Sequence, residues 1–300
     1  MRIAWSPCYA HPLPEGHRFP MDKYTLIPEQ LVHQGIVDRR QFFEPSAMEA
    51  EHLELTHTRN YVNKVLGLQL SPKEMRKIGF PLSAELVARE QVITQGTYDC
   101  ALFALDEGAA MNVAGGTHHA YADSGEGFCI FNDFAVAASR LLHEKKVGQI
   151  LVVDLDVHQG NGTASIFQSE PRVFTFSMHG KDNYPLHKES SDLDIPLQTG
   201  TTGEAYLEIV QGQLPTLTEK VRPDLVFYVS GVDVLSGDKL GKLSLSKAEC
   251  RERDRLVAQH FAQLGIPLVA AMGGGYSPQI GDIVDAHCAT FDEIQAAYFG

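Results

Sequence analysis

The stretch VVDLDVHQGNG, residues 152–162, joins a buried-strand pattern to a run of chemically active side chains. It begins inside an apolar run that is typical of a β-strand covered on both faces. Asp154, Asp156 and His158 then occupy every second position, so on a continuous strand their side chains would share one face. Buried carboxylates are costly unless they are paired, and a Zn²⁺ or another divalent ion would suit two acids beside an imidazole. The alternative is a strand end whose acids are solvated.

Five further apolar runs have strand character, and stretches with helical periodicity lie between them. The strand-like runs cover residues 2–6, 109–116, 172–178, 224–230 and 267–275, and the helix-like stretches cover 83–108, 131–146, 246–265 and 281–299. Candidate helix N-caps are Asn132 or Asp133 and Ser246. Strands that alternate with helices predict an α/β fold with a mostly parallel sheet covered on both faces. We expect one domain over residues 1–300, because no repeat, low-complexity tract or linker divides the chain.

Composition limits the class of protein. The 25 basic and 38 acidic residues give a net charge of −13, which argues against a nucleic-acid-binding surface and is compatible with cationic substrates. The five cysteines form no CxxC pair, so reduced thiols are expected rather than a disulfide framework. No apolar run approaches the roughly 20 residues of a membrane span, and the N-terminus lacks a signal-peptide pattern. We expect a soluble, cytoplasmic protein without a nucleic-acid or membrane partner; nothing in the sequence indicates its oligomeric state.

Polar residues follow four of the predicted strands, where ligands bind in parallel sheets. Asp233, after the strand at 224–230, is the candidate third metal ligand, although an isolated Asp is usually a loop or capping residue. Three protein ligands would leave a coordination position for water and substrate.

Two histidines and a tyrosine are candidates for proton transfer and charge stabilisation. His118 and His119 follow a Gly-Gly turn, and Asp154 and Asn161 could orient their rings; a structural or exposed histidine pair is the alternative. Tyr276 follows three glycines, in a turn that could present its hydroxyl to an oxyanion. The chain has no GxGxxG, GxxxxGK[ST] or GxSxG pattern, so nucleotide binding and serine hydrolase chemistry are weakly supported.

Taken together, six segments resemble the zinc-dependent histone deacetylase family. In chain order they are GGTHHA (115–120), GEGFCIFND (125–133), VVDLDVHQGNGT (152–163), FSMHG (176–180), VSGVDVLSGDKLGKL (229–243) and MGGGYS (272–277). LPEGHRFPMDKY (13–24) and KIGFP (77–81) resemble its bacterial, class IV-like branch. The resemblance implies the arginase–deacetylase fold, a three-layer α/β/α sandwich.

The resemblance also implies roles for individual residues. One Zn²⁺ per chain would be held by Asp156, His158 and Asp233, and a structural K⁺ would have the Asp154 carbonyl among its ligands. His118 and His119 would be the tandem active-site histidines, with His119 as general base and acid, and Tyr276 would stabilise the tetrahedral intermediate. The residues expected to contact substrate are Gly127, Phe128, Tyr184, Leu240 and Gly274.

Two positions depart from the common family pattern. Asn161 stands where the family often has Asp, so we expect a lower pKa for the second histidine than a carboxylate would give. Gln159 stands where many members have a histidine, and the sequence assigns it no consequence.

The implied reaction is hydrolysis of an acetyl or other acyl group from N-acyl-lysine or a related acylated amine, with release of acetate. Three alternatives stay open. They are a deacetylase of acetylpolyamines or other small molecules, an arginase-like ureohydrolase with two metal ions, and a non-catalytic module that binds acyl-lysine.

Overall fold

A computed structural model describes all 300 residues, and its centre is one eight-stranded sheet. The strand order is β2-β1-β3-β8-β7-β4-β5-β6, and every pairing between neighbouring strands is parallel. The strands are β1 (Arg2–Ala4), β2 (Phe42–Phe43), β3 (Ala109–Asn112), β4 (Ile150–Asp154), β5 (Val173–Gly180), β6 (Leu193–Leu197), β7 (Leu225–Val229) and β8 (Leu268–Ala271). The helices are α1 (Lys23–His33), α2 (Ala50–Leu53), α3 (Arg59–Leu66), α4 (Pro72–Ile78), α5 (Ala84–Glu107), α6 (Asp133–His143), α7 (Asn161–Phe167), α8 (Gly203–Val221), α9 (Lys247–Gln263) and α10 (Ile280–Phe299).

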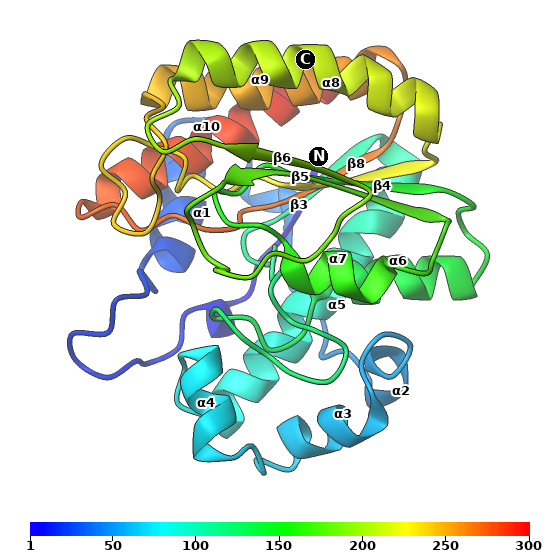
Figure 1. Cartoon of the computed structure of the whole chain (residues 1–300), viewed down its shortest axis with the longest axis vertical. Coiled ribbons are helices and arrows are strands. Elements are labelled where there is room, and N and C mark those ends of the chain that lie inside the picture. The colour runs from blue at the N-terminus through cyan, green and yellow to red at the C-terminus, as the bar shows by residue number, and fades with distance from the viewer.

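Helices cover both faces of the sheet, which confirms the predicted three-layer α/β/α architecture. Helices α8, α9 and α10 lie on one face, and α5, α6 and α7 lie on the other, with α2, α3 and α4 beyond them (Figure 1). Alternate residues of β4 enter two different apolar clusters. Leu151 and Val153 pack under α8, α9 and α10, whereas Ile150 and Val152 pack against the α5–α6 side, as the two-residue period of a strand requires.

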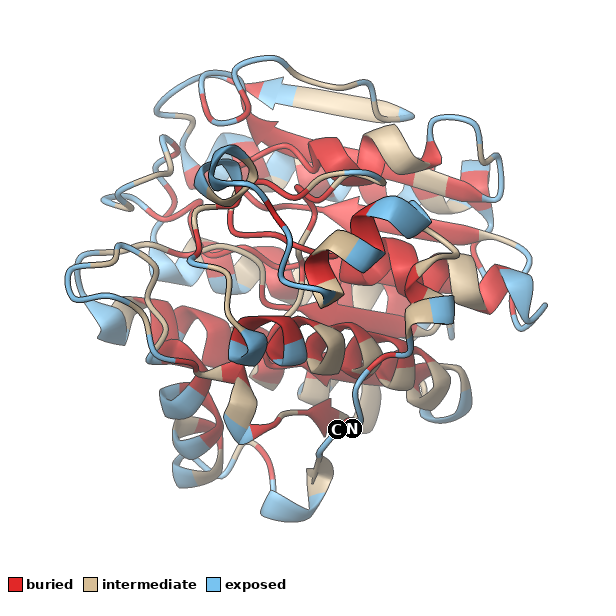
Figure 2. Cartoon of the chain, turned by 90° about the horizontal axis from the view of Figure 1, so that it is seen from below, coloured by how far each residue is buried: buried red, intermediate tan, exposed pale blue.

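Burial follows these layers. Buried residues fill the strands and the sheet-facing sides of the helices, and exposed residues lie on the outer helix faces and the connecting loops (Figure 2). Both faces of the central strands are therefore apolar, which explains their continuous hydrophobic runs. None of the helices has the length and apolar character needed to cross a bilayer.

The structure corrects one detail of the predicted β4 segment. The strand ends at Asp154, so Asp156 and His158 lie in the following loop and not on the same strand face. The carboxylates themselves turn the chain: Asp154 Oδ1 accepts from the Asp156 N–H at 3.1 Å, and Asp156 Oδ1 accepts from the His158 N–H at 2.9 Å. A side-chain carboxylate that accepts a hydrogen bond from the backbone N–H two residues later favours a turn over a continued strand.

The predicted helix caps are confirmed at Asn132 and Ser246. Asn132 Oδ1 accepts from the Ala135 N–H at 3.0 Å, and its amide donates to the Ala120 carbonyl at 3.2 Å and to Thr163 Oγ1 at 3.0 Å. Asn132 is fully buried, so it links α6 to the loop after β3 and to α7. Ser246 forms an exposed capping box with Glu249 at the start of α9.

These two caps give a matched stability prediction. Asn132→Ala removes a cap and leaves buried partners unsatisfied, so we expect a loss of about 2–4 kcal/mol in the free energy of unfolding. Ser246→Ala removes only an exposed cap and should cost about 1 kcal/mol. Urea unfolding of the two variants checks this; equal midpoints would contradict the linking role of Asn132.

Candidate active site

The predicted functional residues meet at the carboxyl ends of four adjacent strands. In the sheet these strands stand in the order β3-β8-β7-β4. The loop after β3 supplies His118 and His119, the loop after β4 supplies Asp156 and His158, and the loop after β7 supplies Asp233. Tyr276 follows β8. The parallel sheet therefore brings together residues that are up to about 160 positions apart, at the edge where parallel sheets bind ligands.

Asp156, His158 and Asp233 form the one cluster in the chain with metal-ligand character. One ligand atom from each lies within 4.8 Å of the others, and all three residues are buried. His158 Nδ1 lies 3.0 Å from Asp156 Oδ1 and 3.2 Å from Asp233 Oδ2. Asp233 Oδ2 is buried, and its contact with His158 Nδ1 lacks the geometry of a hydrogen bond, so this oxygen has no hydrogen-bond partner. Two carboxylates and one imidazole, with one oxygen unsatisfied, fit a divalent cation such as Zn²⁺.

Backbone groups hold the two carboxylates in place. The Gly274 N–H donates to Asp156 Oδ2 at 2.7 Å, and the Val157 N–H donates to Asp233 Oδ1 at 3.0 Å. This close approach needs glycine, since a Cβ on Gly231 would overlap the Asp156 carboxylate and a Cβ on Gly274 would overlap that of Asp233. The glycines after β7 and β8 are thus part of the site.

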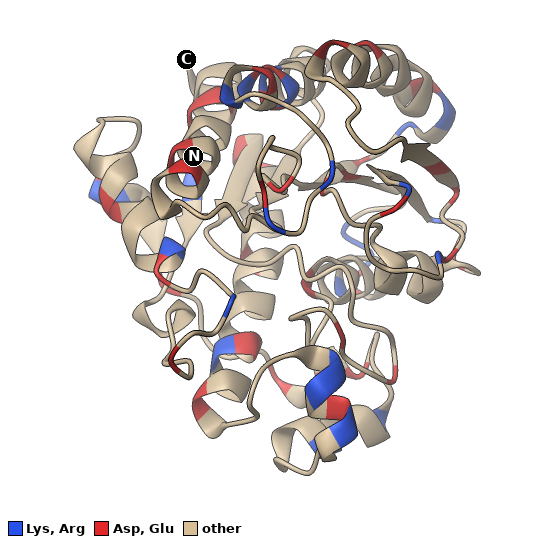
Figure 3. Ribbon diagram, turned by 60° about the vertical axis from the view of Figure 1, so that its left-hand side comes forward, with Lys and Arg blue, Asp and Glu red and all other residues tan.

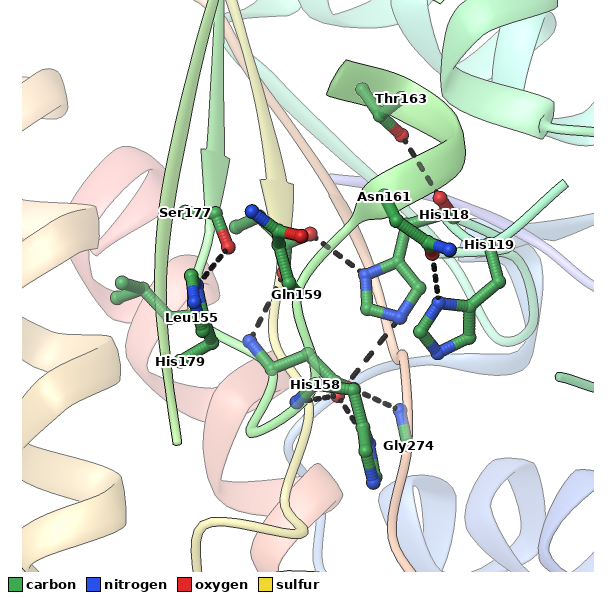
Figure 4. Close-up of polar contacts among 12 residues, drawn as sticks. His118, His119, Leu155, His158, Gln159, Asn161, Thr163, Ser177, His179 and Gly274 are labelled. Carbon is green, nitrogen blue, oxygen red and sulfur yellow. Dashed lines mark hydrogen bonds and ion pairs between the residues drawn. The ribbon is translucent and has the colours of Figure 1, made fainter. Parts of the chain in front are cut away.

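His118 and His119 lie side by side, with ring centres 4.2 Å apart, and each has its own partner (Figure 4). His118 Nδ1 lies 2.7 Å from Asp154 Oδ2. Burial alone would lower the pKa of His118, but the Asp154 carboxylate outweighs it and raises that pKa to about 9. The Asp154 carboxylate thus favours the charged form of His118.

His119 differs because its partner is the amide of Asn161. Asn161 Nδ2 donates to Glu126 Oε1 at 2.6 Å, which directs Oδ1 to His119 Nδ1, 2.6 Å away. That oxygen can only accept, so Nδ1 carries the proton and Nε2 keeps a free lone pair. Burial and the neighbouring His118 and His158 lower the pKa of His119 well below its ordinary value. The Asn161 hydrogen bond acts in the opposite direction, so the expected difference between Asn161 and a carboxylate at this position stays a prediction.

Tyr276 presents a neutral hydroxyl beside these groups. Burial, with the Asp233 and Asp156 carboxylates adding to it, raises the pKa of Tyr276 well above its ordinary value. The Tyr276 N–H donates to Asp238 Oδ2 at 2.6 Å, and Asp238 Oδ1 accepts from the Leu240 and Gly241 N–H groups at 2.8 and 2.9 Å. Asp238 therefore ties the loop after β7 to the tyrosine.

A cavity of about 360 Å³ leads from the surface to these residues. Its wall contains four of the predicted substrate-contact residues, Gly127, Phe128, Tyr184 and Leu240, together with His119, His158 and Tyr276. The Tyr184 hydroxyl donates to Glu126 at 2.7 Å, and its ring stands edge-on to His119 with ring centres 5.0 Å apart. Gly274, the fifth predicted residue, lines a smaller inner cavity of about 40 Å³.

Several residues that support the site were not found by sequence reasoning. Lys23 Nζ donates to the Gly273 carbonyl at 3.1 Å, and Arg253 Nη1 donates to the Gly231 carbonyl at 2.6 Å. Both cations are almost completely buried, and they anchor the two glycine turns behind the carboxylates. A single Lys or Arg in a helix gives no sequence signal of such burial.

Gln159 now has a structural role. Its amide Nε2 donates to the Glu189 carbonyl and to Asp194 Oδ1, both at 2.8 Å, and its Oε1 accepts from the Glu189 N–H at 2.9 Å. Gln159 therefore fixes the loop between β5 and β6, which carries Tyr184, to the loop after β4.

The sequence matches one known family over most of its length. Residues 17–291 match the sequence model of the family described as Histone deacetylase domain. The chain is 44% identical over 285 residues to an uncharacterized protein of Picosynechococcus sp., with 95% of each chain covered. It is 28% identical over 269 residues to Histone deacetylase 2 of Arabidopsis thaliana, with 87% of this chain and 70% of that protein covered.

Solved structures share the fold. A crystal structure of a histone deacetylase homologue complexed with SAHA superposes with a TM-score of 0.84 at 24% identity, covering 99% of this chain and 84% of that one. The homologue from Aquifex aeolicus gives a TM-score of 0.82 at 23% identity, covering 98% and 84%.

The glycine at position 274 provides a test of the ligand cluster. Gly274→Ala places a methyl group on the Asp233 carboxylate, so we expect the affinity for Zn²⁺ to fall by about 10-fold or more. Gly212→Ala, in α8 with no atom near its new Cβ, is the control and should keep full affinity. Competition with a chromophoric chelator measures both. A folded Gly274→Ala variant with unchanged affinity would contradict the assignment.

Proposed function

The chain belongs to the histone deacetylase family, and we propose that it is a metal-dependent amidohydrolase that removes an acetyl or other acyl group from N-acyl-lysine or a related acylated amine. One observation carries the proposal: His119, His158 and Tyr276 line one cavity. His158 belongs to the cluster with Asp156 and Asp233, and His119 is paired with Asn161. A ligand set, a base with a free lone pair and a neutral hydroxyl are what amide hydrolysis by water requires.

Asp156, His158 and Asp233 would hold the metal ion, and we propose Zn²⁺, one per chain. When bound, Zn²⁺ supplies a Lewis acid that polarises the amide carbonyl and lowers the pKa of a water molecule. Side chains of the protein supply the remaining functions, which are proton transfer, positive charge and a hydrogen bond to the oxyanion.

His119 is proposed as general base and then general acid. Its Nε2 accepts the proton of the attacking water while Nδ1 remains hydrogen-bonded to Asn161. The same nitrogen then donates that proton to the departing amine, which leaves as the acyl group is released as acetate. The nearby His118, whose charged form Asp154 favours, would contribute positive charge as the carbonyl oxygen becomes negative.

Tyr276 is proposed to donate its hydroxyl to the developing oxyanion. Its raised pKa keeps the proton on the hydroxyl, so the group stays a donor throughout the reaction. Gly127, Phe128, Tyr184 and Leu240, on the cavity wall, would surround the acyl-lysine chain and exclude water from the reacting amide.

The alternatives are less well supported. An arginase-like reaction would need a second metal site, yet only one group of three candidate ligands is present, and Asp154 is paired with His118. A purely binding module would have no use for a histidine with a free Nε2 beside a neutral tyrosine.

The function itself is tested by acetate release from acetyl-lysine peptides. We expect turnover that is abolished by a strong chelator and restored by about one equivalent of Zn²⁺ per chain. Release of urea with two equivalents of manganese would favour the ureohydrolase instead. Peptide binding without acetate release would favour the binding module.

Two substitutions separate the proposed roles. Tyr276→Phe removes an oxyanion donor, so kcat should fall by about 10²–10³-fold with the fold and the metal content unchanged. His119→Ala should nearly abolish turnover while Zn²⁺ remains bound. Metal analysis and circular dichroism accompany the kinetics. Near-normal turnover of Tyr276→Phe, or loss of Zn²⁺ from His119→Ala, would show that the corresponding role is wrong.

A further inference from the structure

The mouth of the active-site cavity is basic, although the chain as a whole is strongly acidic. Its lining contains four Lys or Arg residues and one carboxylate, that of Asp182; the four are Arg18, Arg76, Lys77 and Lys242. In the whole chain the balance is reversed, with 25 basic and 38 acidic residues. Figure 3 shows that acidic positions are spread widely over the ribbon, so the basic mouth is a local departure.

The four cations come from three separate segments. Arg18 lies in the loop before α1, Arg76 and Lys77 end α4, and Lys242 lies in the loop between β7 and α9. All four are exposed. The fold thus brings positive charges to one opening from positions about 220 residues apart in the sequence.

Most of this charge has no acidic partner inside the protein. Only Lys77 forms an ion pair, with Glu126 at 2.5 Å. The Arg18 guanidinium lies 5.0 Å from the centre of the Phe128 ring, and Lys242 Nζ donates to the backbone carbonyl of Asp182 at 2.8 Å. Neither contact neutralises a charge, and Arg76 forms no ion pair.

Three carboxylates lie at or near the mouth, and each accepts hydrogen bonds. Asp182, in the lining, accepts from the Thr199 hydroxyl at 2.8 Å. Glu126 accepts from Asn161, Tyr184 and Lys77. Asp238 is occupied by three backbone N–H groups. The four cations of the lining outnumber its one carboxylate, Asp182, and remain in excess when the Lys77–Glu126 pair is set aside, so the charge at the opening is positive.

We propose that the acylated amine taken by this site carries carboxylate groups at the end that lies in the cavity mouth, away from the reacting amide, and that Arg18, Arg76 and Lys242 determine this specificity. The proposal rests on the proposed function and names its substrate class. It disfavours the acetylpolyamine alternative and lysine-rich peptides, because each would bring positive charge to three unpaired cations. Leu186, 87% exposed on the same wall, offers an apolar contact beside them.

Two matched substrate pairs test the proposal with the full-length, Zn²⁺-loaded protein. The first pair is an acetyl-lysine peptide flanked by Asp and the same peptide flanked by Lys. The second is Nε-acetyl-lysine and N-acetylcadaverine, which differ only by one carboxylate. At low ionic strength we expect kcat/KM to be about tenfold or more higher for the carboxylate-bearing member. Because exposed charges are screened, the ratio should shrink at about 0.5 M salt.

Charge reversal identifies the residues responsible. The triple variant Arg18→Glu, Arg76→Glu, Lys242→Glu should invert the preference in favour of the Lys-flanked peptide. Arg39→Glu is the control and should leave the ratio unchanged. Arg39 is an exposed cation without an ion pair, just before β2, at the amino ends of the strands, whereas the site lies at their carboxyl ends.

The outcomes separate the two proposals. Acetate release with no preference for carboxylates, or a preference that the triple variant retains, overturns this inference and leaves the proposed function standing. Absence of acetate release from every substrate overturns the proposed function and this inference with it. A preference in the peptide pair alone supports an acidic protein segment as the source of the carboxylates, and a preference in both pairs supports a small carboxylated amine.

Discussion

The site depends on two carboxylates, Asp156 and Asp233, that are buried side by side at the carboxyl edge of a parallel sheet. Burial removes the hydration of both carboxylates, and their like charges repel each other. A bound cation offsets both costs. The protein partly stabilises it with the N–H groups of Gly274 and Val157, and leaves Asp233 Oδ2 unsatisfied. Behind the pair, Lys23 and Arg253 fix the turns at Gly273 and Gly231. The surroundings thus hold the carboxylates rigid and leave their charge for a metal ion.

A second feature is the way in which neighbouring imidazoles are given different chemistry. His118 and His119 are adjacent in the sequence and in space, yet one faces a carboxylate and the other an amide. The Asp154 partner favours the charged form of His118. Burial and the neighbouring imidazoles lower the pKa of His119, and Asn161 leaves its Nε2 with a free lone pair. Glu126 sets this arrangement, because it fixes the orientation of the Asn161 amide. The proposed role of His119 as the base therefore depends on the buried Glu126 carboxylate.

The sequence predicted the sheet and the residues at its edge because both leave periodic signals. Continuous apolar runs marked the central strands, and DxDxH and the glycine turns marked their ends. It missed β6, which contains Pro196 and is half exposed, and α8, whose pattern is interrupted by Gly212 and Pro215. The sequence pattern also extended β4 past Asp154. The pattern does not show that the Asp154 and Asp156 carboxylates accept from backbone N–H groups two residues onward, and these bonds end the strand. The supporting roles of Lys23, Arg253, Glu126 and Asp238 depend on burial and partners that no local pattern records.

The central claim is that one divalent cation binds between Asp156, His158 and Asp233. Its most direct test is a crystal structure of the Zn²⁺-loaded chain with anomalous data collected on both sides of the zinc absorption edge. The account predicts a single zinc peak about 2.0–2.2 Å from one oxygen of each carboxylate and from one nitrogen of His158. A peak elsewhere, two peaks at the site, or the three side chains turned apart around solvent in zinc-rich crystals would contradict it.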